Sequence, residues 1–217
     1  MARIIFDLDG TLIDSAPDIQ AVANGVLGAE GHQPITLEQT RSFIGNGAPT
    51  FVARMRAARD IPDSEQDRLL TAFKIGYVSA VDLTVVFDGV VPALEALKAK
   101  GHSLGICTNK PFKPTEAILA HLDMARLFDS VIGGDTLPTH KPDPAMLHAA
   151  ADALGDGPVI YVGDSEVDAE TAQRGGVPFL FFTEGYHKTD LNSIPKTAAF
   201  GSYADFVDLI EKTLALA

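Results

Sequence analysis

The chain has 217 residues, 46% hydrophobic and 21% charged, and its 29 acidic against 17 basic side chains give a formal net charge of −12 at pH 7. The length allows one generous domain or a core with a small added module, and the composition excludes disordered and collagen-like chains. An acidic surface without a run of Lys and Arg repels phosphate backbones and anionic lipids, so we expect no nucleic-acid partner and no membrane partner.

The cysteine content and the hydropathy both point to a reducing, aqueous compartment. Cys107 is the only cysteine, which excludes an internal disulfide and a thiolate metal cluster. The N-terminal apolar run is interrupted at Asp7 and Asp9, far short of a signal-peptide core, and no stretch reaches the ~20 apolar residues of a membrane span. We therefore expect a cytoplasmic protein.

The first predicted element is a strand over residues 3–8, and a helical region follows it. Within residues 14–87 no good strand is found, and the helix patterns are a periodic stretch over 18–29, a capping-box sequence at Thr36–Gln39 and a second periodic stretch over 69–79. Three or four helices between two strands exceed an ordinary crossover. We therefore predict an all-helical cap domain at 14–87, inserted into a core domain formed by 1–13 and 88–217. The alternative is that these helices belong to the main helical layer.

After residue 87 strands and helices alternate. Further strands are predicted over 103–108, 130–133, 159–163 and 179–183, and helices over 94–100, 145–154, 165–173 and 204–217. Continuous apolar strands are typical of a sheet that is covered on both faces, and alternation with helices indicates parallel pairing. The fold class is therefore α/β, a doubly wound parallel sheet with a small helical cap.

Reactive side chains follow four of these strands, at the edge where doubly wound sheets bind ligands. They are Asp7, Asp9 and Gly10 after the first strand, Thr108, Asn109 and Lys110 after the second, Lys141 beyond the third, and Asp164 and Asp168 after the fourth. Clustered carboxylates repel one another unless a cation compensates, and oxygen ligands without His or Cys favour Mg²⁺. With a lysine and amide donors beside the metal, this set predicts phosphoryl transfer through an aspartyl-phosphate.

These motifs resemble those of phosphatases in the haloacid dehalogenase superfamily. The matching segments appear in the family's order and span essentially the whole chain: DLDGTL at 7–12, Thr108–Asn109, Lys141 in HKPDP, and GDSEVD at 163–168. Within that superfamily the chain is most similar to bacterial phosphoglycolate phosphatases, through RSFIGNG at 41–47 and GGDTLPTHKPDP at 133–144. The resemblance implies that residues 14–87 are the cap that this family inserts after its first motif.

The resemblance also implies roles for the core residues. Asp7 would attack phosphorus, and Asp9 would protonate the leaving alkoxide and later deprotonate the hydrolytic water. Dehalogenases of this superfamily lack the second aspartate, so Asp9 favours phosphate chemistry over C–halogen cleavage. The remaining implied roles are as follows: Mg²⁺ held by Asp7, the Asp9 carbonyl and Asp164, with Asp168 assisting directly or through water; phosphoryl oxygens held by Thr108, Asn109 and Lys141; and a close turn at Gly10.

In the cap, we expect backbone amides of Gly45 and Asn46, together with Arg41, to meet the distal group of the substrate; a simple turn at Gly45–Gly47 and a solvent-facing Arg41 are the alternatives. The predicted function is a Mg²⁺-dependent phosphatase for a small phosphorylated metabolite, with 2-phosphoglycolate as the leading substrate. A sugar phosphomutase of the same superfamily and a non-catalytic phospho-accepting signalling module are the alternatives. The sequence leaves open whether the protein is a monomer or a homodimer.

Overall fold

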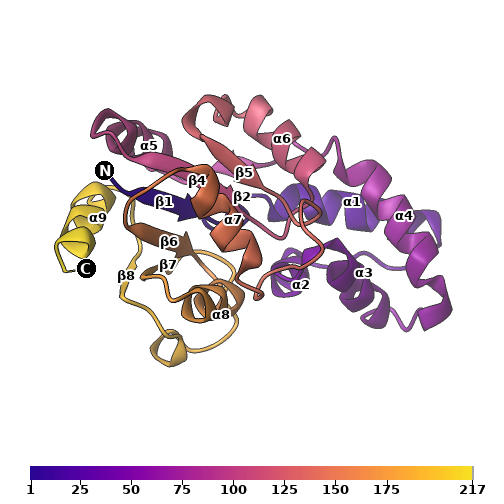
Figure 1. Ribbon diagram of the computed structural model, residues 1–217. Helices are drawn as coiled ribbons and strands as arrows, with labels where there is room; N and C mark the ends of the chain where they lie inside the picture. Colours follow the sequence, from indigo (N-terminus) through magenta and orange to yellow (C-terminus); the bar gives the residue numbers. More distant parts are fainter. Residues whose placement is uncertain (217) are drawn as a thin grey trace.

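The computed structural model describes residues 1–216 and contains a six-stranded parallel sheet at its centre (Figure 1). The strand order is β5-β4-β1-β6-β7-β8, and every pair in it is parallel. The strands are β1 (Arg3–Phe6), β4 (Ser103–Cys107), β5 (Ser130–Ile132), β6 (Val159–Gly163), β7 (Phe179–Phe182) and β8 (Ala198–Phe200). Because β1 pairs with β4 on one side and β6 on the other, the segments after these three strands leave the sheet side by side.

Helices cover both faces of the sheet, because successive side chains of each strand point to opposite faces. Ile4 and Phe6 of β1 join one buried hydrophobic cluster, whereas Ile5 between them joins the cluster on the other face. The first cluster is covered by α5 (Val90–Ala99), α6 (Phe112–His121) and α9 (Phe206–Ala215), and the second by α7 (Ala145–Ala153) and α8 (Glu166–Gly175).

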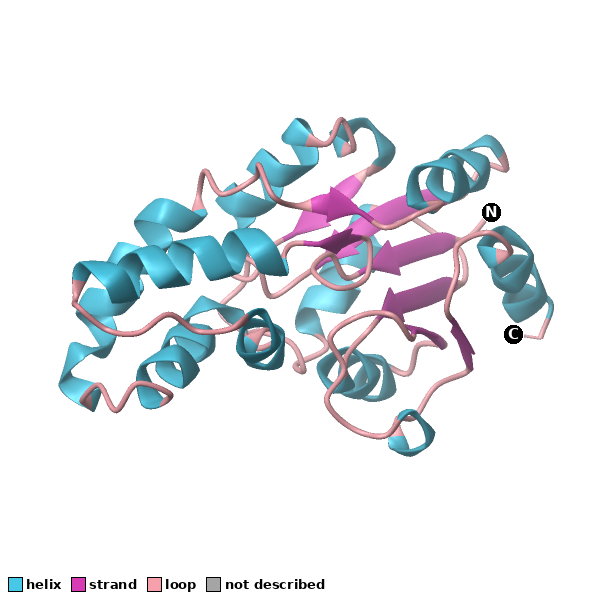
Figure 2. Cartoon of the chain, turned by 180° about the vertical axis from the view of Figure 1, so that it is seen from behind, coloured by secondary structure: helices cyan, strands magenta, loops and turns pink. Residues whose placement is uncertain are grey.

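The helical region between the first two core strands forms a separate layer with its own hydrophobic cluster. It contains α1 (Ala16–Ala29), α2 (Leu37–Phe43), α3 (Gly47–Ala57) and α4 (Gln66–Tyr77). The strand arrows of the sheet point toward these helices (Figure 2). The helices therefore stand over the carboxyl ends of the strands, where ligands of doubly wound sheets bind.

This architecture confirms the predicted α/β fold with a helical insertion. The core at 1–13 and 88–217 and the cap at 14–87 remain our division of the chain, and two short antiparallel strands, β2 (Ile13–Asp14) and β3 (Val85–Val86), lie at its boundary. None of the described helices is long and apolar enough to cross a membrane.

Several elements differ from the sequence-based expectation. Neither β2 nor β3 was expected, since two-residue strands leave no periodicity. The edge strand β8 and helix α3 were not predicted either. Strand β8 has only three residues, and α3 begins at Gly47 after Asn46, whose side chain makes no capping hydrogen bond, so neither leaves a clear sequence signal. Residue 217 of the predicted C-terminal helix lies outside the described residues. The remaining short 3-10 helices are Asp63–Glu65, Ala125–Leu127 and Leu191–Ser193.

Candidate active site

Three carboxylates converge where β1 and β6 end. Asp7 follows β1, Asp164 follows β6, and Asp168 lies in the first turn of α8, with one oxygen of each within 4.8 Å of the others. All three residues are buried, with relative exposures of 8% for Asp7, 1% for Asp164 and 0% for Asp168. Buried like charges at this separation require a cation.

Lys141 supplies one cation to this cluster. Its ammonium lies 2.7 Å from Asp168 Oδ1 and 3.0 Å from Asp7 Oδ1, and its side chain is 1% exposed. Burial opposes the charged form of Lys141, but the negative charges of Asp168 and Asp7 outweigh burial and raise its pKa above the ordinary lysine value. Lys141 is therefore a permanent positive charge beside Asp7.

Asp168 is held by protein donors on both of its oxygens. Oδ1 accepts hydrogen bonds from Lys141 and from the Tyr161 hydroxyl, at 2.7 Å each. Oδ2 accepts from the Ser165 backbone N–H at 3.1 Å and from the Ser165 hydroxyl at 2.5 Å. Together with the Asp168 N–H to Ser165 contact, this is a capping box for α8. Asp168 thus caps a helix and orients Lys141 at the same time.

Asp7 and Asp164 retain free acceptor capacity. Asp7 Oδ1 is buried and accepts no hydrogen bond from the described part of the chain, although the Lys141 ammonium lies 3.0 Å away. Asp164 accepts one hydrogen bond on each oxygen, from the Thr11 hydroxyl and the Tyr186 N–H, both at 2.6 Å. Carboxylate oxygens with unused lone pairs, buried and close together, are ligands suited to a hard divalent cation.

Burial raises the pKa values of both Asp7 and Asp164. Burial raises the pKa of Asp7 to about 6, although Lys141 acts to lower it. Burial, followed by the charges of Asp168 and Asp7, raises the pKa of Asp164 well above its ordinary value. A bound divalent cation would offset the repulsion between the carboxylates, which adds to the effect of burial on both values.

Two glycines allow the chain to approach Asp164 closely. Gly10 has φ +88°, a conformation that favours glycine, and a Cβ placed there would collide with the Asp164 carboxylate. A Cβ at Gly185 would collide with the same side chain. The predicted close turn at Gly10 therefore lies against an acid of the cluster, and the sequence reasoning did not identify the second contact, at Gly185.

Thr108 and Asn109 lie beside the cluster at the end of β4, as expected from the sequence. The Thr108 hydroxyl accepts the Lys110 N–H at 3.2 Å. The Asn109 side chain makes two hydrogen bonds with the backbone of Lys141. Its Oδ1 accepts from the Lys141 N–H at 3.0 Å, and its Nδ2 donates to the Lys141 carbonyl at 3.1 Å. Its amide also donates to the Gly45 carbonyl at 2.9 Å. In this structure Asn109 therefore ties the loop of Lys141 to the cap.

Asp9 faces the cap rather than the carboxylate cluster. Its Oδ1 accepts the Ser15 hydroxyl at 2.6 Å and lies 3.2 Å from the Lys110 ammonium. Lys110 also donates to the Tyr77 hydroxyl of α4 at 2.7 Å. The sequence analysis assigned no role to Lys110 or to Tyr77. Lys110 directly follows the Thr108–Asn109 motif, and this position was the one available clue.

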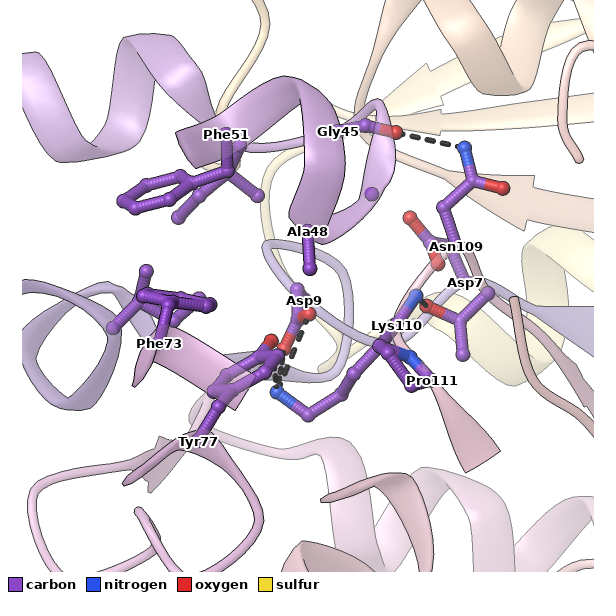
Figure 3. Close-up of a pocket in the computed structure, with 14 residues that line it drawn as sticks. Asp7, Asp9, Gly45, Ala48, Phe51, Phe73, Tyr77, Asn109, Lys110 and Pro111 are labelled. Atoms are coloured by element: carbon purple, nitrogen blue, oxygen red, sulfur yellow. Dashed lines mark hydrogen bonds and ion pairs between the residues drawn. The ribbon is translucent and has the colours of Figure 1, made fainter. Parts of the chain in front are cut away.

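A small pocket lies between the strand ends and the cap (Figure 3). The core contributes Asp7, Asp9, Thr108, Asn109, Lys110 and Pro111, and the cap contributes Ile19, Ile44, Gly45, Gly47, Ala48, Phe51, Phe73 and Tyr77. The floor is therefore polar and charged, whereas the roof is mainly apolar. Gly45 lines the pocket, and its carbonyl accepts a hydrogen bond from Asn109. The expected contact of its backbone amide with a substrate stays a prediction.

The structure does not bring the other two predicted cap residues into this pocket. Arg41 pairs with Asp14 at 2.8 Å, and its side chain is 45% exposed. Asn46 accepts a hydrogen bond from Arg54 at 2.9 Å and lines a neighbouring groove instead. Arg41 is already paired with Asp14, so its expected contact with a substrate has no support in this geometry. The expectation for Asn46 concerns its backbone amide, which the bond from Arg54 to its side chain does not test, so it stays a prediction.

Comparison with known proteins places this site in a family. A sequence model of haloacid dehalogenase-like hydrolases matches residues 1–176. A phosphoglycolate phosphatase of Cereibacter sphaeroides is 44% identical over 218 residues, covering 99% of this chain and 100% of that protein. Phosphoglycolate phosphatase 1 of Pseudomonas aeruginosa is 38% identical over 190 residues, covering 85% of this chain and 70% of that protein.

A solved structure agrees. The crystal structure of a predicted phosphoglycolate phosphatase from Haemophilus somnus has a TM-score of 0.88 and 29% identity, covering 95% of this chain and 96% of that one. The chain therefore belongs to the haloacid dehalogenase-like hydrolase family, and it is an enzyme of the phosphomonoester hydrolase class.

Proposed function

We propose that this enzyme hydrolyses 2-phosphoglycolate to glycolate and phosphate, with Mg²⁺ and with phosphorylation of Asp7. The observation that carries the proposal is one small pocket with Asp7 and Asp9 in its floor and the buried Lys141 ammonium 3.0 Å from Asp7. Full-length similarity to a phosphoglycolate phosphatase supports the choice of substrate.

The metal would be held by Asp7, Asp164 and the backbone carbonyl of Asp9, with Asp168 adjacent. The three buried carboxylates fit such an ion, and so does Asp7 Oδ1, which accepts no hydrogen bond in the described part of the chain although it pairs with Lys141. When bound, Mg²⁺ would supply positive charge to the phosphoryl oxygens. Because both oxygens of Asp168 already accept hydrogen bonds, we assign Asp168 the task of orienting Lys141 and place any contact with the metal through water.

In the first step an Asp7 carboxylate oxygen attacks phosphorus, and the bond between phosphorus and the alkoxide oxygen breaks. Asp9, in its protonated form, gives its proton to that oxygen, so glycolate leaves as the alcohol. Lys141 offsets the negative charge that gathers on the phosphoryl oxygens. Thr108 accepts the Lys110 N–H, which leaves its own hydroxyl proton free for a phosphoryl oxygen.

In the second step water attacks phosphorus, and the bond between phosphorus and the Asp7 oxygen breaks. Asp9, now a carboxylate, takes the proton of the water, and Asp7 returns as a free carboxylate. The apolar roof of Phe51, Phe73 and Ile44 limits the water that reaches the pocket. The cycle ends with phosphate release.

The test is phosphate release from a panel of phosphomonoesters, with Mg²⁺ and with EDTA. We expect 2-phosphoglycolate to give the highest kcat/KM, EDTA to abolish turnover, and Asp7→Asn to remove activity. Asp152→Asn, an exposed acid on α7, is the matched control and should keep wild-type rates.

Three outcomes would contradict the proposal. Activity that persists in Asp7→Asn would exclude Asp7 as the nucleophile. Isomerisation of a sugar phosphate without release of free phosphate would identify a phosphomutase. A long-lived phosphoprotein with negligible turnover would identify a phospho-accepting module.

A further inference from the structure

The pocket contains an unexplained cation. Lys110 is the only Lys, Arg or His that lines it within residues 1–216. Its side chain is 3% exposed, and its ammonium lies between Asp9 and Tyr77 of the cap (Figure 3). The cation that pairs with the Asp7–Asp164–Asp168 cluster is Lys141 instead. A buried ammonium is costly unless it has anionic or hydrogen-bonding partners, so its position calls for an explanation.

The contacts of Lys110 account for part of its capacity. The ammonium donates to Asp9 at 3.2 Å and to the Tyr77 hydroxyl at 2.7 Å, and it lies 4.3 Å from the centre of the Tyr77 ring. Burial, followed by the charge of Asp9, raises the pKa of Tyr77 well above its ordinary value, so Tyr77 is a neutral partner. A lysine has three N–H donors, and the third reaches only Asp9 Oδ2, at 3.5 Å. A contact this long is a weak hydrogen bond, so an incoming acceptor can take its place.

The surroundings of Lys110 offer no competing cation. Ile19, Ile44, Phe51 and Phe73 form the apolar walls of the pocket. Arg41 is paired with Asp14 outside the pocket. The Lys188 ammonium donates to the Ile44 carbonyl at 2.8 Å, but Lys188 does not line the pocket. An anionic group that enters the roof of this pocket therefore meets Lys110.

The position of Lys110 relative to Asp9 sets the size of that anion. In the proposed function Asp9 protonates the oxygen that leaves phosphorus, so the two groups are within hydrogen-bonding distance during the reaction. In 2-phosphoglycolate the carboxyl carbon is two bonds from that oxygen. The Lys110 ammonium, 3.2 Å from Asp9, therefore lies within reach of the carboxylate of a two-carbon substrate.

We propose that Lys110 binds the carboxylate of the substrate and makes the pocket selective for phosphorylated 2-hydroxy acids over neutral phosphomonoesters. This inference rests on the proposed function, because it takes Asp9 as the group that faces the leaving oxygen. Lys110 is held by Tyr77 from α4, so the cap contributes to this selectivity by positioning a lysine that belongs to the core.

The experiment compares two substrates of matched length, 2-phosphoglycolate and 2-hydroxyethyl phosphate, in wild type and in Lys110→Met. Removing one partner of a buried charge pair costs enough to lower kcat/KM for 2-phosphoglycolate by about 30-fold or more. Because Lys110 also pairs with Asp9, 2-hydroxyethyl phosphate should lose activity as well. This substrate lacks the carboxylate, so we expect its loss to be smaller than that of 2-phosphoglycolate by about fivefold or more. Lys110→Arg should restore part of the preference.

A control and a binding measurement separate the alternatives. Lys113→Met removes an exposed lysine of the neighbouring groove and should leave both substrates unaffected. The Asp7→Asn protein, titrated with 2-phosphoglycolate in Mg²⁺, should lose affinity when Lys110→Met is added. Equal losses on both substrates, or unchanged affinity, would overturn the role of Lys110. If wild type binds but does not hydrolyse 2-phosphoglycolate, the proposed function fails, and the affinity ratio still tests Lys110.

Discussion

The core half and the cap half of the pocket differ in how their polar groups are held. In the core, Lys141 and Asp168 are linked to each other and to Tyr161 and Ser165, so the side chains are fixed by hydrogen bonds within the sheet and α8. In the cap, the roof is an apolar cluster, and polar contact with the core is made by a few groups such as Tyr77 and Gly45. The difference supports our proposal that the core performs the phosphoryl chemistry and that the cap helps to set which substrate fits.

The largest expected effect separates the packing of the cap from that of the core. Phe73 is 1% exposed and packs against Phe51 and Tyr77, with ring centroids 5.2 and 5.1 Å apart. Phe73→Ala leaves a cavity in the cap and should lower the free energy of unfolding by about 3–5 kcal/mol, measured by urea denaturation. Ile75→Ala, 74% exposed on the same helix, is the control and should stay within about 0.5 kcal/mol of wild type. Equal losses for both variants would refute a packed cap.

The next effect tests whether the core acts on every substrate alike. Lys141→Met removes the cation beside Asp7 and should lower kcat by about 10²–10³-fold, comparable to losing one group that stabilises transition-state charge. Because the phosphoryl group is common to all substrates, kcat should fall by the same factor for 2-phosphoglycolate and for 2-hydroxyethyl phosphate in steady-state assays. A loss confined to one substrate would show that Lys141 recognises the leaving group instead.

A third, smaller effect concerns pH and the metal. The Asp7 pKa rises from 3.8 to about 6 in the folded protein without metal, so the folded state binds this proton more tightly than the unfolded state. Stability of the metal-free protein should therefore fall as pH rises from about 4 to 6. Mg²⁺ needs the carboxylate, so the increase in Tm on adding Mg²⁺ should be small at pH 4.5 and larger at pH 7.5, by differential scanning calorimetry. The same increase at both pH values would contradict the assignment of Asp7 as a ligand.

The smallest effect is expected at Arg41, the cap residue that the sequence favoured. Its pair with Asp14 is 45% exposed on the arginine side, and such pairs contribute about 0.2–1 kcal/mol. Arg41→Ala should leave kcat/KM for 2-phosphoglycolate within about threefold of wild type. A selective loss of more than tenfold on this substrate, with 2-hydroxyethyl phosphate unaffected, would return Arg41 to the substrate site.

The core half could be predicted because its residues follow strands. Buried parallel strands produce apolar runs, and Asp7, Thr108 and Asp164 stand directly after them, so topology alone places them at one edge. The cap half could not be predicted in the same way. Helical periodicity locates the helices but not the direction in which Tyr77 or Arg41 points. The sequence placed Lys110 at the strand edge but gave it no role, because its partner Tyr77 lies in the cap, on a helix whose orientation the sequence does not predict.

The central claim is that Asp7 carries the phosphoryl group during turnover. The most direct measurement quenches the enzyme during hydrolysis of 2-phosphoglycolate, reduces acyl phosphates with borohydride and identifies the modified peptide by mass spectrometry. We expect homoserine at position 7 when Mg²⁺ and substrate are both present, and unmodified Asp7 when EDTA is added or the substrate is left out. The Asp152→Asn control should give the same result as wild type. Rapid turnover with no homoserine at position 7, or homoserine at another aspartate, would contradict the central claim.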